Sequence, residues 1–370
     1  MSYVREVTNA RTLAWLMFDA IVDAAGAGEV NPWGPGTTFA PDHETLARLL
    51  GVPAQLRASS QSGVPALALD VWVAHELRRA GFDPDAVWPR ASEPRVLPTE
   101  LPRFIERLPE RLAREVAGYL RTVGGAAAAT LLGKNYVKQV DVVISSWTTG
   151  PELLISTKRM DSSFGKNAAN RVEESYGDAK NLRLRHPRAA LGFVFALSAR
   201  AYEREPATAE RIVDLLIKLG REDDAYDAVA LVVPDLTPDQ EAPATGSDDA
   251  APAGPVAEVS KLDSSEPGSL ELQNPPVPGD LDAPVILPVR DAGDLFAAQL
   301  PGVTDLPVVP LRVADVPPDL DPARFLRVMA DRVLDNSPVD FHREARRRRR
   351  DGSARGAGGR SQGGVSVLPD

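Results

Sequence analysis

Two residues with complementary chemistry, Asp141 and Lys158, stand at the two ends of the stretch DVVISSWTTGPELLISTK. The stretch predicts two strands joined by a turn at 148–151, because runs of apolar and β-branched residues flank Thr-Thr-Gly-Pro. In an antiparallel hairpin with that turn, Asp141 falls opposite Thr157 and close to Lys158. Such a pair suits phosphodiester hydrolysis: the carboxylate holds a divalent cation, the cation polarises the phosphate and lowers the pKa of a bound water, and the lysine orients that water.

The elements that must position this pair follow from the apolar pattern of residues 98–236. The pattern predicts a helix over 101–121, paired strands over 136–147 and 152–158, a helix over 166–184, a strand over 188–197, a helix over 206–220 and a strand over 226–233. The strand over 188–197 is almost continuously apolar, which is typical of a strand buried on both faces. This order predicts an α/β fold with a mixed sheet flanked by helices.

The segment resembles the PD-(D/E)XK nuclease superfamily, which has the restriction-endonuclease-like fold. The resemblance rests on the order of elements and on an aspartate, one hairpin, and a lysine two residues after a strand position that usually carries a second acid. Here Ser156 occupies that position. One branch of restriction enzymes with serine-x-lysine on the strand takes the acid from the following helix. Glu115, in the helix before the hairpin, is a further possible acid by the same resemblance, with an ordinary surface role as the alternative.

Two glutamates in the helix after the hairpin are candidates for the displaced acid. Glu173 lies fifteen residues after Lys158, and Glu174 lies sixteen after it. At about 100° per residue, the apolar stripe of this helix places Glu173 at its edge and turns Glu174 away. We therefore expect Asp141, Lys158 and Glu173 to be catalytic, with Asp141, Glu173 and the main-chain carbonyl of Thr157 as ligands of Mg²⁺, for which Mn²⁺ substitutes. Ser156 and Glu174 remain possible members of the site.

Charge is distributed unevenly along this acidic chain, whose formal net charge is −10. Residues 134–188 contain ten Lys and Arg against six Asp and Glu. This basic stretch favours a nucleic acid as partner, because cations that contact phosphates release counterions. The expected phosphate contacts are Lys134, Lys138, Lys166 and Lys180. Glu152, beside the turn, is expected to face water.

Three regions follow from composition. Residues 1–97 predict a mostly helical region, with helices near 9–25, 42–50 and 65–81. Residues 98–236 predict the nuclease-like core. Residues 237–370 predict a largely disordered tail, because 236–288 hold ten prolines and ten acids and the last stretch is arginine-rich. A single short helix near 322–335 is the exception.

Several classes of protein are disfavoured by what the chain lacks. There are no cysteines, which excludes disulfides, thiolate metal sites and cysteine nucleophiles, and the four histidines have no metal-ligand spacing. No apolar run is long enough for a membrane span, and the N-terminal segment does not resemble a signal peptide. We expect a cytoplasmic protein without a membrane partner.

Three functions remain open at this point. The first is a magnesium-dependent DNA endonuclease of a restriction or phage-defence system, as a possible homo-oligomer or with a partner protein of that system. The second is a non-catalytic, nuclease-like module that binds nucleic acid or a partner, which the missing strand acid favours. The third is a regulator acting through the N-terminal helices, against which its poor recognition helix counts.

Overall fold

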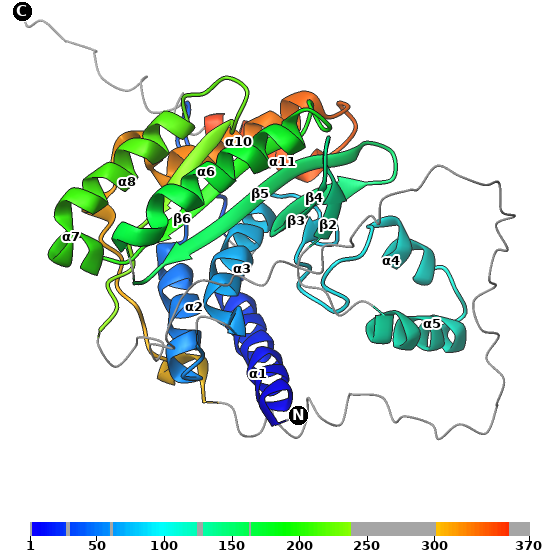
Figure 1. The fold of residues 1–370 in the computed structure, drawn as a ribbon. Helices are drawn as coiled ribbons and strands as arrows, with labels where there is room; N and C mark the ends of the chain where they lie inside the picture. The colour runs from blue at the N-terminus through cyan, green and yellow to red at the C-terminus, as the bar shows by residue number, and fades with distance from the viewer. Residues whose placement is uncertain are drawn as a thin grey trace, which may run out of the picture.

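A five-stranded mixed sheet forms the centre of the molecule, for which we describe a computed structural model (Figure 1). The structure describes residues 2–26, 30–59, 62–123, 129–162, 164–237 and 301–354. The strand order is β1-β4-β5-β6-β7. The strands are β1 (Val87–Trp88), β4 (Val142–Ser146), β5 (Gly150–Met160), β6 (Ala190–Leu197) and β7 (Ala228–Val232). Strand β4 runs antiparallel to β1 and β5, whereas β5, β6 and β7 are parallel to one another. The predicted α/β class with a mixed sheet is confirmed.

Helices cover both faces of this sheet. One face packs on α1 (Ser2–Ala25), α2 (His43–Gln55), α3 (Val64–Arg79) and α10 (Pro322–Asn336). The other packs on α6 (Phe164–Arg183), the short α7 (Arg200–Arg204) and α8 (Pro206–Leu219). In Figure 1 the blue helices α1 to α3 and the green helices α6 to α8 lie on opposite sides of the strands. Alternate residues of β6 enter the two apolar clusters, and all eight are buried, as the apolar run predicted.

The strand expected over 136–147 is interrupted at Asp141. Strand β3 (Val137–Val140) ends before it and pairs with β2 (Ala129–Leu132) in a separate two-stranded sheet, and β4 begins after it. The pairing of Val142 with Ile155 shifts the β4–β5 register by one residue from the expected one. The hairpin turns earlier than predicted, with Ser146 opposite Gly150, and a β-bulge between Ile144 and Ser145 offsets part of this, which leaves a net shift of one residue.

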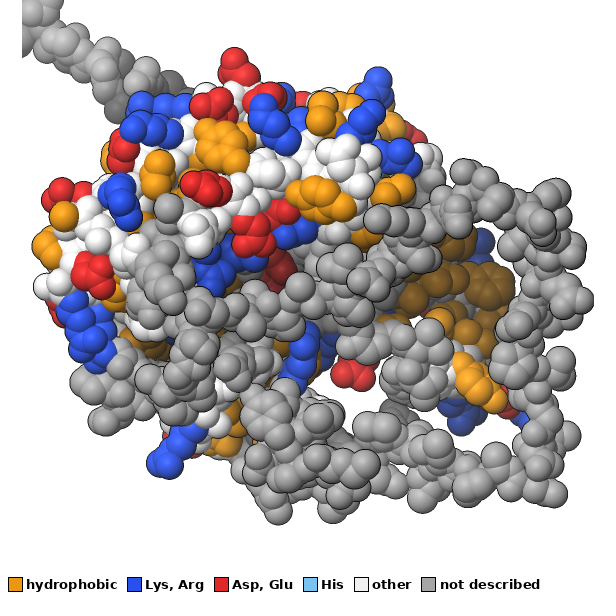
Figure 2. Space-filling model, viewed as in Figure 1, with side chains coloured by type: hydrophobic (Ala, Val, Ile, Leu, Met, Phe, Trp, Pro, Cys, Tyr) orange, Lys and Arg blue, Asp and Glu red, His pale blue; other side chains and the backbone are white. Residues whose placement is uncertain are grey.

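The helix expected over 101–121 is in fact two helices. Helix α4 (Glu100–Ile105) and helix α5 (Glu110–Val123) are separated at Pro109, which lacks an N–H and disfavours a helical residue before it. The apolar side chains of α5 are partly exposed: Leu112 is 44% and Tyr119 75% exposed. In Figure 2, hydrophobic side chains gather over this part of the molecule. The helix that packs against β4 and β5 is instead α3, from the N-terminal region.

Residues 301–354 are folded, so the expectation of disorder was wrong for them. They contain three 3₁₀ turns, η3 (Val303–Asp305), η4 (Val313–Asp315) and η5 (Pro318–Leu320), followed by α10 and α11 (Arg343–Ala354). The predicted short helix is confirmed as α10, whose Phe325 and Met329 are fully buried against the sheet. Residues 238–300 and 355–370 lie outside the described residues.

The arginine run of the expected tail belongs to α11 and is bound within the fold. Arg346 donates to the carbonyl oxygens of Leu334 and Ser337, and Arg349 pairs with Asp331 at 3.0 Å. Composition alone predicted a flexible basic tail because it does not reveal these acceptors on α10. Among the described residues, no helix is both long and apolar enough to cross a membrane.

Candidate active site

Asp141 lies at the junction of β3 and β4, where it faces β5. Its carboxylate Oδ2 accepts a hydrogen bond from the backbone N–H of Thr157 at 2.8 Å. The Asp141 side chain thus binds the Thr157 N–H, which a strand carbonyl would otherwise accept. This contact occurs where the chain breaks between β3 and β4. The contact places the Asp141 carboxylate beside the residue that precedes Lys158.

A second carboxylate, from Asp70 on α3, meets the same residue of β5. The hydroxyl of Thr157 donates to Asp70 Oδ1 at 2.5 Å, and Asp70 is only 5% exposed. Side chains of a strand alternate between faces, so Thr157 points toward α3 while Lys158 points toward α6. Sequence analysis missed Asp70. The signal was an acid within the otherwise apolar run VPALALDVWVA, where a charge is rarely buried without a partner.

The two aspartates have perturbed acidities. Burial raises the pKa of Asp70 well above its ordinary value, and the charge of Asp141 raises it further. Burial also raises the pKa of Asp141, although the Thr157 N–H and the Lys158 ammonium oppose the rise. The Lys158 ammonium opposes the rise at both carboxyl groups, and a further cation beside them would act in the same direction.

Glu174, not Glu173, is the glutamate of α6 that faces Lys158. Its Oε1 lies 3.8 Å from Lys158 Nζ and 3.5 Å from Lys138 Nζ. Glu173 is exposed, and none of the described side chains pairs with it. The expected helical phase was wrong because two polar residues, Ser175 and Asp178, belong to the buried face at 2% and 5% exposure. A stripe defined by apolar residues alone pointed to the wrong side of the helix.

Lys138 reaches the site from β3 and binds α6. Its ammonium contacts the buried carboxylate of Asp178, to which the Tyr136 hydroxyl donates a hydrogen bond at 3.2 Å. Burial by itself would lower the pKa of Lys138, but the hydrogen bond and charge of Asp178, with the charge of Glu174, raise it overall. Lys138 is thus held as a cation against α6 and is not an exposed phosphate contact.

The other predicted residues lie elsewhere or are engaged. Ser156 is buried at 6% exposure on β5. Glu115 is exposed and forms an i,i+4 pair with Arg111 at 3.1 Å, which agrees with its surface alternative. Lys180 pairs with Asp224 at 2.5 Å, whereas Lys134 is exposed. The side chain of Lys166 lies outside the described residues.

The basic stretch is therefore less basic in three dimensions than in sequence. Besides Lys138 and Lys180, Arg159 pairs with Asp161 and Arg183 with Asp227, both within 3.0 Å. On the face that Figure 2 presents, Lys and Arg side chains are interspersed with Asp and Glu side chains. Intramolecular pairs neutralise much of the field on which the expectation of nucleic-acid binding rested.

The carboxylates fit a magnesium or manganese ion by donor type. Within the described residues, no three histidine or acidic side chains are grouped so that they could hold a metal. Mg²⁺ commonly takes one or two carboxylates and completes its shell with waters and phosphate oxygens. Asp141 and Glu174 are two carboxylates, the donor type and number that this smaller requirement names, and each contacts β5 at Thr157 or Lys158.

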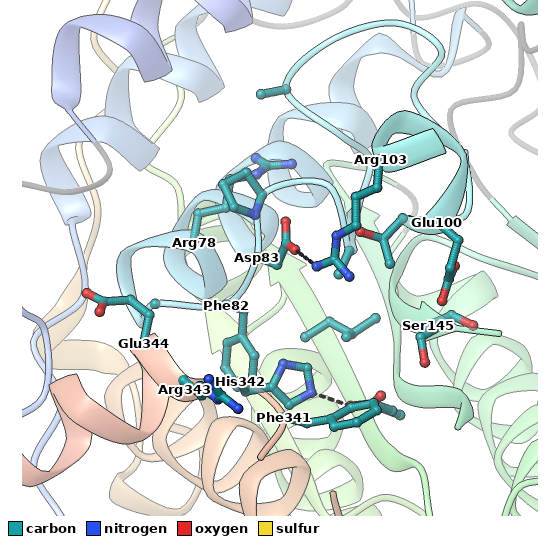
Figure 3. A pocket seen from close by; sticks show the side chains of 18 of the residues that line it. Arg78, Phe82, Asp83, Glu100, Arg103, Ser145, Phe341, His342, Arg343 and Glu344 are labelled. Carbon is teal, nitrogen blue, oxygen red and sulfur yellow. Dashed lines mark hydrogen bonds and ion pairs between the residues drawn. The ribbon is translucent and has the colours of Figure 1, made fainter. Parts of the chain in front are cut away.

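A cleft lies at the other end of the β4–β5 hairpin (Figure 3). Its volume is about 900 Å³, and Phe82, Phe341 and His342 line it. Glu152 at its edge is 7% exposed, contrary to the expectation that it faces water, and accepts from His342 Nε2 at 2.5 Å. The pair ties the hairpin to the chain between α10 and α11, away from Lys158.

The search for related proteins found no match among protein-family models, curated proteins or solved structures.

Proposed function

We propose that the protein is a divalent-cation-dependent nuclease that hydrolyses phosphodiester bonds in DNA. The observation that carries the proposal is that two carboxylates from other elements contact neighbouring residues of β5: Asp141 binds the Thr157 N–H, and Glu174 lies 3.8 Å from Lys158 Nζ. A hairpin with an aspartate at its start and serine-x-lysine near its end, followed by a helix that returns a glutamate to that lysine, is the arrangement that the resemblance implies. The sequence β4–β5–α6–β6–α8–β7 supports a restriction-endonuclease-like fold.

Each residue of the candidate site has a role in this proposal. Asp141 and Glu174 would hold the cation, with the Thr157 carbonyl as the expected third ligand. The ion, when bound, polarises the scissile phosphate and acidifies a water. Lys158 would orient that water, and its contact with Glu174 would keep the ammonium beside the residues that hold the ion. Asp70 holds the Thr157 hydroxyl and adds negative charge behind Asp141.

The adjacent glutamates of α6 provide the test. Glu174→Gln should lower the rate of DNA cleavage at least about a hundredfold, because it removes a charged ligand of the ion while keeping the side-chain volume. Glu173→Gln should leave the rate unchanged within about twofold, since its side chain points to solvent. The assay is cleavage of plasmid and phage DNA by the full chain with Mg²⁺ or Mn²⁺, with circular dichroism to confirm folding.

The outcomes separate the candidate functions. Equal loss in both variants would contradict the assignment of Glu174. Binding of DNA by the wild-type chain without cleavage in either metal would instead support the non-catalytic module, which the buried Ser156 in place of a strand acid favours. If the wild-type chain neither cleaves nor binds DNA, nucleic acid is not its substrate.

A further inference from the structure

Glu174 is shared between two lysines, whereas one of those lysines is itself shared between two acids. Glu174 Oε1 lies 3.5 Å from Lys138 Nζ and 3.8 Å from Lys158 Nζ. Lys138 Nζ makes its shorter contact with Asp178. The side chain of Glu174 is 49% exposed, but those of Lys138 and Asp178 are 18% and 7% exposed. The Lys138–Asp178 pair is therefore the better shielded of the two and the stronger.

The geometry of α6 makes the two acids compete. Glu174 and Asp178 are four residues apart, so they occupy the same face of the helix, one turn from each other. Lys138 enters from β3 between them. The Tyr136 hydroxyl also donates to Asp178, which fixes that carboxylate in place. The closer the Lys138 ammonium lies to Asp178, the weaker its attraction for Glu174.

We propose that Lys138 and the divalent cation compete for the Glu174 carboxylate, and that Asp178 decides the competition by holding Lys138. The inference rests on the proposed function in one respect, namely that Glu174 is a ligand of the ion. Asp178 and Lys138 are then positioning residues that tune how tightly the site binds its metal. They act through Glu174 and contact no substrate.

Opposite effects on metal affinity are the signature of this arrangement. Asp178→Asn releases Lys138 to Glu174 and should weaken Mn²⁺ binding about tenfold, a size typical of changes behind a metal ligand. Lys138→Gln removes the competitor and should strengthen Mn²⁺ binding roughly two- to fivefold, the equivalent of one partly exposed ion pair. The double variant should resemble Lys138→Gln, because without the lysine the identity of residue 178 no longer matters to Glu174.

Direct measurement of Mn²⁺ binding to the full chain by electron paramagnetic resonance tests this without reliance on cleavage. Glu173→Gln is the matched control: it removes the exposed neighbouring carboxyl group of α6 and should change affinity less than twofold. Thermal unfolding of each variant accompanies the titration. The Lys138 side chain is more exposed than that of Asp178, so Lys138→Gln still tests the inference if Asp178→Asn unfolds.

A shift in the same direction for both single variants, or no shift, overturns the inference, since general damage moves both the same way. Retention of the full Asp178→Asn loss in the double variant also overturns it. The proposed function fails separately, if wild-type protein binds Mn²⁺ in a Glu174-dependent manner yet cleaves no DNA. If Glu174→Gln leaves Mn²⁺ affinity unchanged, the metal assignment and this inference both fall.

Discussion

Thr157 illustrates how a single residue organises the site at the residue scale. Its N–H binds Asp141 and its hydroxyl binds Asp70, so two acids from separate elements meet on one residue of β5. Glu174 then approaches from the opposite face, by way of Lys158. The two faces of one strand thus bring three acids to the same few residues.

The hydroxyl of Thr157 can be removed without loss of volume. Thr157→Val should lower the free energy of unfolding by about 1–3 kcal/mol, because it leaves the buried Asp70 carboxyl without its described donor. Thr157→Ser keeps the hydroxyl and should cost about 1 kcal/mol or less of the same quantity. Urea denaturation at neutral pH measures both. If the two variants are equally destabilised, the loss comes from packing and not from the hydrogen bond.

At the scale of elements, a buried pair connects the hairpin turn to the segment between α10 and α11. Glu152 accepts from His342 and from the Ser337 hydroxyl at 2.9 Å, and the Thr149 hydroxyl also donates to it. Burial by itself would raise the pKa of Glu152, but these hydrogen bonds and the histidine lower it overall. The ionised form is therefore the one that the fold stabilises.

The sign of this pKa shift fixes a pH dependence. A carboxyl whose folded pKa is lowered contributes stability that is present above its ordinary pKa of 4.5 and is lost as the pH falls through the lower folded value. Glu152→Gln should therefore be less stable than wild type at neutral pH, and the difference should shrink as the pH falls below the ordinary pKa of Glu152. Thermal unfolding across this range measures it. A difference that stays constant with pH would show that the charge of Glu152 contributes nothing.

At the scale of the whole molecule, segments distant in sequence form one body. Strand β1 and helix α3, from residues 1–97, pack on β4 and β5, and α10 packs on β5, β6 and β7. Gly51 on α2 has no room for a side chain, since a Cβ there would lie 1.7 Å from the Pro307 carbonyl oxygen. The three regions expected from composition do not correspond to three separate packing units.

Residues 301–354 should accordingly remain bound when the chain is cut. A protease site engineered into 238–300 should yield two fragments that co-elute in size-exclusion chromatography and separate only in denaturant, because α10 buries Phe325 and Met329 in the shared core. Gly51→Leu in the same cut chain should weaken the association, since its side chain meets backbone at Pro307. Separation of the wild-type fragments in native buffer would contradict this view of the core.

The sequence by itself determined the elements whose signal is local. The apolar run of β6, the hairpin of β4 and β5 and the amphipathic α10 could all be predicted, because periodicity and turn residues act over a few neighbouring positions. The approach of Asp141 to the residue next to Lys158 was predictable for the same reason, because a hairpin brings positions on its two strands close together.

Only the tertiary structure decided which other residues join them. Asp70 lies 87 positions from Thr157, and its contact depends on how α3 crosses the sheet. The choice of Glu174 over Glu173 depends on which face of α6 is buried. Asp178 lies on that face, where Lys138 of β3 and Tyr136 just before β3 contact its carboxylate. Ser175 lies there with its hydroxyl bound to the Arg171 carbonyl oxygen. The folding of 301–354 likewise depends on a sheet face more than sixty residues earlier in the chain. Contacts of this kind form between surfaces that are distant in sequence, and a local pattern carries no record of the partner surface.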